Sequence, residues 1–262
     1  MQALILAAGM GTRLKDLTKD SAKCMVKVNG KTLIERMLNQ LDRLNLREII
    51  IVAGYKADKL ISYINSLDIK TPISFVKNDF YDKTNNIYSL YIARECLLKD
   101  DTLLLESDLI FSDGVLRRLI NNPYPDLALV AKYENWMDGT VVTIDSQYNI
   151  TSFIQKKNFD FNDIQKYYKT VNIYKFSKHF LQQYYVPFLK AYIDSRGSNE
   201  YYEQVLKVLS VMEKSTIKAE VLEGEPWYEI DDVQDLDIAE SIFSENGFGK
   251  IRTRYGGYWR YP

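Results

Sequence analysis

Two glycines and two basic residues follow the apolar segment at the start of this chain. In MQALILAAGMGTRLKDLTKDSAKCMVKVNG they are Gly9, Gly11, Arg13 and Lys23. A glycine-rich turn that leaves a first strand lets backbone amides approach a phosphate closely, because no Cβ stands in the way. Two cations beside such amides suit a triphosphate whose charge moves onto a leaving pyrophosphate. The residues alone leave two alternatives open, an ordinary tight turn and solvated surface cations.

The glycine spacing differs from that of two widespread phosphate-binding motifs. The third glycine of a dinucleotide-binding motif would be residue 14, which is Leu14. No Gly-Lys-Ser or Gly-Lys-Thr sequence follows at the spacing of a Walker motif. A dinucleotide-dependent oxidoreductase is therefore disfavoured.

Two acidic segments supply carboxylates that could hold a metal ion. LLLESDLIF places Glu106 and Asp108 directly after an apolar run, and YEIDDVQDLD contains Glu229 and Asp231. Strand alternation would put Glu229 and Asp231 on the same face. Magnesium bound to a nucleoside triphosphate takes one or two protein carboxylates and keeps water elsewhere. Helix capping by Asp108 or Asp231 is the alternative interpretation.

Composition argues against several other chemistries. Among 262 residues there are two cysteines, Cys24 and Cys96, in no metal or redox spacing, and one histidine, His179. Zinc sites, Ser-His-Asp triads and Cys-His nucleophiles are therefore not expected. With 34 basic and 35 acidic residues the net charge is −1, so no global field attracts nucleic acid or an anionic membrane. No apolar run approaches the roughly 20 residues of a membrane helix, and the start lacks a cationic leader and cleavage site, so we expect a cytoplasmic protein.

The first half of the chain alternates short β-branched runs with amphipathic stretches. Leu33, Met37 and Leu41 recur at helical spacing, and Thr32 with Glu35 has the form of a capping box. Strands that alternate with helices predict a doubly wound parallel sheet with helices on both faces. The predicted strands are Ala3–Leu6, Ile49–Val52, Ile73–Val76 and Thr102–Leu105.

The second half predicts strands with little helix between them, and then helices. The predicted strands are Leu127–Ala131, Thr140–Ile144, Ile150–Phe153, Thr170–Tyr174, Ile217–Val221 and Trp227–Glu229, of which the last two close the sheet. The predicted helices are Lys178–Asp194, Glu200–Val211 and Val233–Phe243. No repeat, low-complexity segment or linker interrupts this pattern, so we predict a single domain over residues 1–245. Residues 246–262 are a tail rich in glycine and aromatic residues, which is either docked or frayed, or else begins a linker to a second domain.

These motifs resemble those of a known family. LILAAGMGTRL, followed by AKCMVKVNGKTLIERML, resembles the signature of the sugar-phosphate nucleotidyltransferases, the nucleotide-sugar pyrophosphorylase family. Ala22 and Thr32 stand where that family usually has proline, and neither change removes a charge. NNIYSLY at Asn85–Tyr91 and WYEIDDVQDL at Trp227–Leu236 resemble the bacterial CTP:phosphocholine cytidylyltransferases within it. LLESDLIF also resembles the cytidylyltransferases of aminoethylphosphonate, some of which are fused to a pyridoxal-phosphate aminotransferase.

The resemblance implies both a fold and an activity. The implied fold is a Rossmann-like α/β fold of the nucleotide-diphospho-sugar transferase type, with a mixed, mostly parallel sheet flanked by helices. The implied activity is a Mg²⁺-dependent transfer of CMP from CTP to a small phosphate or phosphonate acceptor, phosphocholine first, giving CDP-choline and pyrophosphate. Lys23, Arg13, Asp108 and Asp231 would be catalytic, and Asp108 and Asp231 would bind the metal. The residues expected to bind the nucleotide are Leu6, Ala7, Ala8, Gly9, Gly11, Thr12, Arg13, Gly54, Asn85, Asn86 and Ser89.

Aromatic and acidic residues supply the predicted acceptor site. Aromatic faces attract quaternary ammonium groups through cation–π contact, about 0.5–2 kcal/mol each. A primary amine would instead favour a carboxylate, Glu134 or Asp138. The expected acceptor contacts are Tyr133, Trp136, Asp138, Tyr174, Trp227 and Glu229. These aromatic residues could equally pack a core, and Asn85, Asn86 and Ser89 could equally cap a helix.

Two other functions remain open at this point. A uridylyl- or thymidylyltransferase acting on a sugar 1-phosphate would share the fold and the loop. A non-catalytic nucleotide sensor would have no use for the full set of Arg13, Lys23, Asp108 and Asp231, so we expect an enzyme.

Overall fold

A central sheet organises this chain in the computed structural model, which describes residues 1–212, 217–244, 251–252 and 258–259. The strand order is β10-β9-β11-β6-β1-β4-β5, and β8 pairs with both β11 and β12. The strands are β1 (Gln2–Ala7), β4 (Ile49–Ala53), β5 (Ile73–Lys77), β6 (Thr102–Glu106), β8 (Leu127–Lys132), β9 (Val141–Ile144), β10 (Ile150–Ile154), β11 (Tyr168–Phe176) and β12 (Lys218–Val221). The four consecutive strands β6, β1, β4 and β5 are parallel to one another. The strand β11 is antiparallel to β6, β8 and β9. The predicted Rossmann-like mixed sheet is confirmed.

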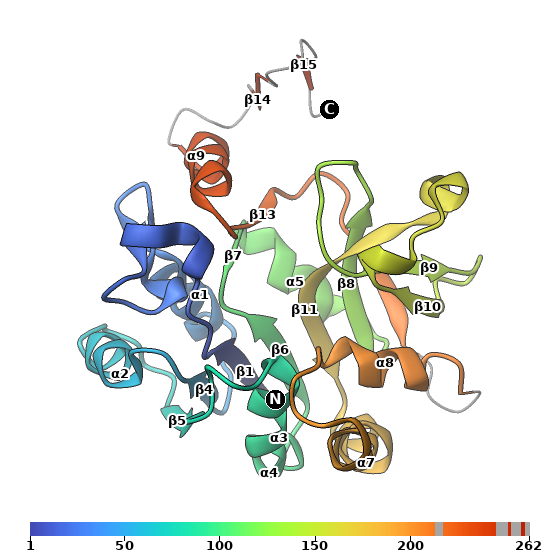
Figure 1. Ribbon diagram of the computed structural model, residues 1–262, viewed down its shortest axis with the longest axis horizontal. Coiled ribbons are helices and arrows are strands. Elements are labelled where there is room, and N and C mark those ends of the chain that lie inside the picture. The colour runs from blue at the N-terminus through green and yellow to red at the C-terminus, as the bar shows by residue number, and fades with distance from the viewer. Residues whose placement is uncertain (213–216, 245–250, 253–257, 260–262) are drawn as a thin grey trace.

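Helices flank this sheet (Figure 1). They are α1 (Leu33–Asp42), α2 (Ala57–Asn65), α3 (Asn86–Ile92), α4 (Arg94–Leu97), α5 (Asp113–Asn121), α6 (Lys178–Phe180), α7 (Val186–Arg196), α8 (Glu203–Leu209) and α9 (Val233–Ile242). A π-helical turn, Leu181–Tyr185, joins α6 to α7, where the sequence predicts one helix over Lys178–Asp194. At the start of α1 the Thr32 hydroxyl accepts a hydrogen bond from the Glu35 amide at 3.1 Å. The Glu35 carboxylate accepts from the Tyr63 hydroxyl at 2.9 Å, so only half of the predicted capping box forms.

The core lies on both faces of the sheet, because successive residues of a strand point to opposite sides. Ala3 and Ile5 of β1 pack in one buried cluster with residues of α1, α2 and α5. Leu4 and Leu6 pack in another cluster with residues of α3, α7 and α8. All of β1 and β4 is buried, as expected of central strands in a parallel sheet covered on both sides.

Short strand pairs lie outside the central sheet. They are β2 (Lys27–Val28) with β3 (Lys31–Thr32), and β7 (Leu109–Phe111) with β13 (Trp227–Glu229). The prediction that Trp227–Glu229 closes the main sheet is therefore wrong, since the chain leaves that sheet after β6 and offers β7 as a separate partner. A third buried cluster includes Leu14, Ile110, Tyr228 and Ile230. This cluster fixes the loop after β1 against β13 and α9.

Most of the predicted tail lies outside the described residues. Within it, β14 (Ile251–Arg252) pairs with β15 (Tyr258–Trp259). The linker to a second domain therefore stays a prediction. No helix in the described ranges combines the length and the hydropathy needed to cross a membrane.

Candidate active site

The loop after β1 and the segment after β6 meet at one edge of the sheet. These strands are parallel neighbours in which Leu6 pairs with Glu106, and the Ser107 amide donates to the Leu6 carbonyl at 3.2 Å. Ligands of open α/β sheets bind at the carboxyl ends of such strands. The glycines of the loop and Asp108 are therefore brought to one place, as the sequence predicts.

The two glycines of the loop have different surroundings. Gly11 has a φ of +63°, and a Cβ built on it would lie 2.8 Å from Lys23 Cγ. The Thr18 hydroxyl donates to the Gly11 carbonyl at 2.8 Å and holds the turn. A Cβ on Gly9 would have no atom within 4 Å. Gly11 is thus required for packing against Lys23, whereas the backbone at Gly9 is open to a ligand.

Lys23 lies at the centre of a cluster of cations and carboxylates. Its Nζ is 2.7 Å from Asp108 Oδ2 and 2.8 Å from Asp231 Oδ1. Arg13 Nη2 is 2.8 Å from the same Asp231 oxygen. Burial alone would lower the pKa of Lys23, but the two carboxylates outweigh it and hold this pKa above its ordinary value. Burial alone would raise the pKa of Asp231, yet Lys23 and Arg13 lower it. The four residues predicted to be catalytic therefore form one connected cluster.

Three carboxylates crowd together around Asp108. Glu106, Asp108 and Glu229 each offer an oxygen within 4.8 Å of the others. Burial raises the pKa of Glu106 well above its ordinary value, and Asp108 raises it further. Asp108 Oδ1 is buried and has no hydrogen-bond partner among the described residues. An all-oxygen donor set with surplus negative charge and an unpartnered oxygen fits a hard divalent cation such as Mg²⁺.

This trio differs from the metal pair that the sequence predicts. Asp108 and Asp231 are bridged by the Lys23 ammonium, while Glu106 and Glu229 approach Asp108 directly. The sequence places Glu106 among the carboxylates that could hold a metal ion, whereas the resemblance assigns the metal to Asp108 and Asp231. The position of Glu106 at the end of the buried strand β6 is the signal for a role in metal binding, because a carboxylate buried there needs a compensating partner.

A cleft beside the loop encloses about 610 Å³, counting space open to solvent. It is lined by Leu6, Ala8, Gly9, Lys23, Asn78, Tyr81, Thr84, Asn85, Asn86, Ser89, Glu106, Ser107 and Asp108. Six of the predicted nucleotide contacts belong to this lining: Leu6, Ala8, Gly9, Asn85, Asn86 and Ser89. The other five, Ala7, Gly11, Thr12, Arg13 and Gly54, lie outside this lining. Ala7 points into the core on the other face, and Arg13 lies beside Asp231.

The polar side chains at the start of α3 are partly used by the protein itself. Asn85 Oδ1 accepts from the Asn86 amide at 2.8 Å, so the capping interpretation holds for Asn85. Asn86 donates to Glu106 Oε1 at 3.2 Å and accepts from the Tyr202 amide at 3.0 Å. Ser89 is buried and accepts from Asn78 at 3.1 Å. Asn78, Tyr81 and Thr84, which line the same cleft, are missed by the sequence analysis because no motif singles them out.

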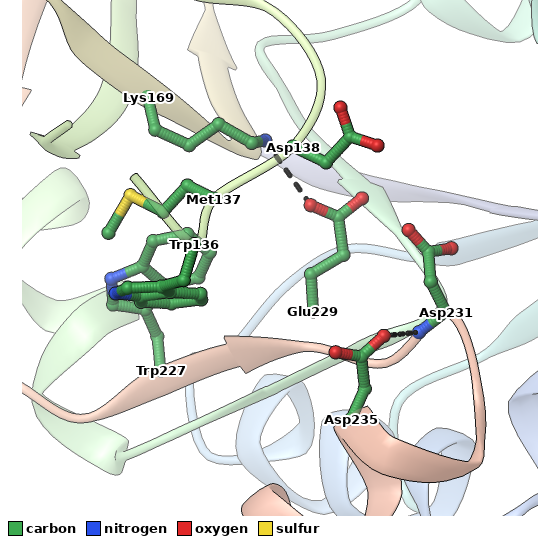
Figure 2. Close-up of a pocket in the computed structure, with 8 residues that line it drawn as sticks. All are labelled: Trp136, Met137, Asp138, Lys169, Trp227, Glu229, Asp231 and Asp235. Carbon is green, nitrogen blue, oxygen red and sulfur yellow. Dashed lines mark hydrogen bonds and ion pairs between the residues drawn. The ribbon is translucent and has the colours of Figure 1, made fainter. Parts of the chain in front are cut away.

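A second pocket, of about 350 Å³ when space open to solvent is counted, lies at Asp231 (Figure 2). It is lined by Trp136, Met137, Asp138, Lys169, Trp227, Glu229, Asp231 and Asp235. Trp136 is 53% exposed and stacks on Tyr228 with ring centroids 5.2 Å apart. Asp138 pairs with Lys156 at 3.1 Å. Four of the six predicted acceptor contacts, Trp136, Asp138, Trp227 and Glu229, thus share one pocket.

The other two predicted acceptor contacts lie elsewhere. Tyr174 is fully buried and packs against Phe176 and Tyr202, so the prediction that it contacts the acceptor is wrong. Its strand β11 runs between β6 and β8 inside the sheet, and the ring belongs to the core cluster that includes α7 and α8. Tyr133 packs edge-on against Phe159 with centroids 5.6 Å apart and does not line the pocket. Of the four aromatic residues among the predicted acceptor contacts, the two tryptophans therefore line this pocket and the two tyrosines do not.

Known proteins resemble this chain over most of its length. A family model described as a MobA-like NTP transferase domain matches residues 3–182. A CTP:phosphoglutamine cytidylyltransferase from Campylobacter jejuni is 30% identical over 91% of this chain and 98% of its own length. A CMP-5'-(3-aminopropyl)phosphonate synthase from Streptomyces rubellomurinus is 26% identical over all of this chain, which spans 42% of that relative. The solved structure of the CTP:phosphocholine cytidylyltransferase from Streptococcus pneumoniae superposes with a TM-score of 0.75 at 26% identity, covering 93% of this chain and 99% of that one.

Proposed function

Because this chain belongs to the MobA-like NTP transferase domain family and is a nucleotidyltransferase, we propose that it transfers a cytidylyl group from CTP to a small phosphate or phosphonate acceptor. The position of Lys23 carries this proposal. Lys23 lines the cleft beside the glycine loop, and its Nζ contacts Asp231, which lines the second pocket. A nucleotide in the first pocket and an acceptor in the second would meet at this ammonium, and such alignment accounts for much of the rate in reactions of this type.

The chemistry needs no nucleophile from the protein. An oxygen of the acceptor phosphate or phosphonate attacks the α-phosphorus of CTP in line. A new P–O bond forms, the bond to the β-phosphate breaks, and pyrophosphate leaves with the electron pair. Since the pKa of Lys23 is held above its ordinary value, Lys23 stays protonated near neutral pH and cannot act as a base. It would instead stabilise negative charge on the α-phosphate and the acceptor.

Triphosphate binding would exchange the partners of the two loop cations. Both cations contact carboxylates in this structure, and the same N–H groups are the ones that would contact phosphate oxygens. The side chain of Arg13 is 62% exposed, so it is free to turn toward a β- or γ-phosphate. Lys23 is 13% exposed and already lines the cleft, so a small shift suffices.

The carboxylates around Asp108 fit the metal ion that enzymes of this family typically use. A bound Mg²⁺ would neutralise phosphate charge and polarise the α-phosphate. Asp108 would hold it together with Glu106 and Glu229, whose oxygens lie within 4.8 Å of one another, and Asp231 is the further ligand that the sequence predicts. Asp231 becomes available for this role when Lys23 and Arg13 turn to the phosphates.

The second pocket favours an acceptor that carries a positive charge. Its lining holds two tryptophans and four carboxylates. Asp138, Glu229 and Asp231 are paired with cations of the protein, so the aromatic faces carry this preference, because they attract an ammonium group through cation–π contact. A hexose phosphate has no such group. We therefore propose phosphocholine as the first candidate acceptor, and aminoalkylphosphonates and phosphoglutamine as alternatives of related chemistry.

The test is pyrophosphate release in the presence of Mg²⁺. CTP, UTP, TTP, ATP and GTP would each be combined with phosphocholine, aminoethylphosphonate, phosphoglutamine and glucose 1-phosphate. Release with CTP and one acceptor that bears an amino or ammonium group is the expected result, and it identifies the substrate. Release with UTP or TTP and glucose 1-phosphate would keep the reaction type but refute both the base and the acceptor.

A further inference from the structure

An irregularity in β11 faces the carboxylates of the proposed active site. The register of β11 against β8 shifts between Thr170 and Tyr174, and we call this irregular segment the bulge. Within it Asn172 has a φ of +59°, although it is not glycine and is only 5% exposed. A left-handed residue in a strand costs free energy, and such conformations persist where the surroundings enforce them, often at functional sites.

Side chains of Asn172 in this bulge and of Lys169 directly before it contact both oxygens of Glu229. Lys169 Nζ is 3.2 Å from Glu229 Oε2, and Asn172 Nδ2 donates to Glu229 Oε1 at 3.3 Å. Figure 2 shows Lys169 reaching Glu229 across the pocket. The carboxylate is therefore held at two points, which fixes the plane of the group as well as its position.

Each of the two contacts is itself supported. Lys169 is 2% exposed and donates to the Thr170 carbonyl at 2.6 Å. The Thr170 hydroxyl donates to Asn172 Oδ1 at 2.9 Å. The Thr170 hydroxyl also lies 3.1 Å from the Thr140 carbonyl. Because a carboxylate can only accept, the contact with Glu229 sets the Asn172 amide with its NH₂ toward that carboxylate. The loop before β9 closes over the same lysine at Gly139, where a Cβ would lie 3.3 Å from Lys169 Cε and where φ is +94°.

We propose that Lys169 and Asn172 are positioning residues, which hold the Glu229 carboxylate toward Asp108 for metal binding, and that the left-handed backbone of Asn172 serves this purpose. This inference rests on the proposed function, in which Glu229 contributes to the metal site. Neither residue touches the reacting groups. Partners that orient a metal ligand are commonly worth about 10- to 100-fold in metal affinity or activity.

Two substitutions test the proposal, each with a matched control. Asn172→Gly keeps the left-handed backbone without strain and removes the side-chain amide. The melting temperature of this variant should be equal to that of wild type or higher, while its Mn²⁺ binding falls. Lys169→Met removes the charge and keeps much of the stem, and Lys169→Arg should restore part of the loss. Asn45→Gly is the control for strain, since Asn45 is exposed with a φ of +52°. Lys175→Met is the control for a buried lysine of the same strand, because Lys175 is 6% exposed and donates to the Asn122 carbonyl at 2.6 Å.

The readout is Mn²⁺ binding to the nucleotide-free protein, measured by electron paramagnetic resonance, together with melting temperature. Asn172→Gly and Lys169→Met should weaken Mn²⁺ binding about 10-fold or more, and both controls should leave it unchanged. Equal Mn²⁺ binding in wild type and both variants, or none in any of them, overturns the proposal. If the variants weaken Mn²⁺ binding but the wild-type protein releases no pyrophosphate with any substrate pair, the proposed function fails while the positioning role stands.

Discussion

The cleft proposed to bind the nucleotide and the pocket proposed to bind the acceptor are constructed differently. The residues that line the cleft all fall between positions 6 and 108, and most of them end or follow parallel strands or begin α3. Small or polar side chains dominate this lining. The acceptor pocket draws on residues 136–138, 169 and 227–235, and its lining is aromatic and charged. Function resides in sites that a fold carries rather than in the fold itself. In the proposed function the first pocket would fix the reaction, whereas the second would be free to select the acceptor.

The largest expected effect is at Lys23, where the two pockets meet. Lys23→Ala should lower kcat about 10²- to 10³-fold or more with every acceptor, because it removes the ammonium that stabilises charge at the reacting phosphorus. Pyrophosphate release under saturating substrates measures this, and circular dichroism checks the fold. Lys27→Ala, at an exposed position of β2, is the control and should behave as wild type. Wild-type turnover in Lys23→Ala would remove this residue from the mechanism.

A comparable loss is expected at the carboxylates. Asp108→Asn should lower activity about 100-fold and abolish its ordinary dependence on Mg²⁺, since Asp108 has the unpartnered buried oxygen of the cluster. A Mg²⁺ titration of the rate is the measurement. Asp113→Asn, at the exposed start of α5, is the control. An unchanged Mg²⁺ titration in Asp108→Asn would mean that the metal lies elsewhere.

A smaller and more selective effect is expected in the acceptor pocket. Trp136→Ala should raise KM for a cationic acceptor about 2- to 30-fold, the equivalent of 0.5–2 kcal/mol of cation–π contact, and leave KM for CTP unchanged. Steady-state kinetics with each substrate varied in turn would separate the two. Tyr124→Ala, an aromatic residue of similar exposure outside the pocket, is the control. Equal changes in both KM values would break the distinction between the two pockets.

The smallest effect concerns stability and pH. Burial raises the pKa of Glu203, at the start of α8, to about 7. The folded protein therefore keeps a proton that the unfolded chain releases above its ordinary pKa, so stability falls as pH rises from about 4.5 toward 7. Glu203→Gln should consequently gain melting temperature over wild type, by several degrees at pH 8 and little at pH 5. Melting curves from pH 5 to pH 8 measure the difference in melting temperature, with Glu223→Gln, at an exposed position, as the control. A difference between Glu203→Gln and wild type that does not change with pH would contradict the raised pKa of Glu203.

The sequence predicts the nucleotide side of the site far better than the acceptor side. Gly9, Gly11, Arg13 and Lys23 lie in one short segment, and Asp108 follows a strand whose apolar run is plain in the sequence. Parallel strands place their carboxyl ends at one edge, so a local pattern is enough to bring these residues together. Tyr174 illustrates the opposite case, because alternation along β11 is interrupted by a bulge that no sequence pattern announces.

By itself, then, the sequence determined the strand–helix order, the glycine loop and the residues that carry charge, because apolar periodicity and glycine conformations are local properties. Only the tertiary structure decided which charges meet. Lys23 contacts Asp231 across 208 positions of sequence, and Lys169 reaches Glu229 from a different strand. Such pairs depend on the pairing of β7 with β13 outside the main sheet and on the place where β11 is irregular. These two features follow from the packing of the entire core rather than from any one segment.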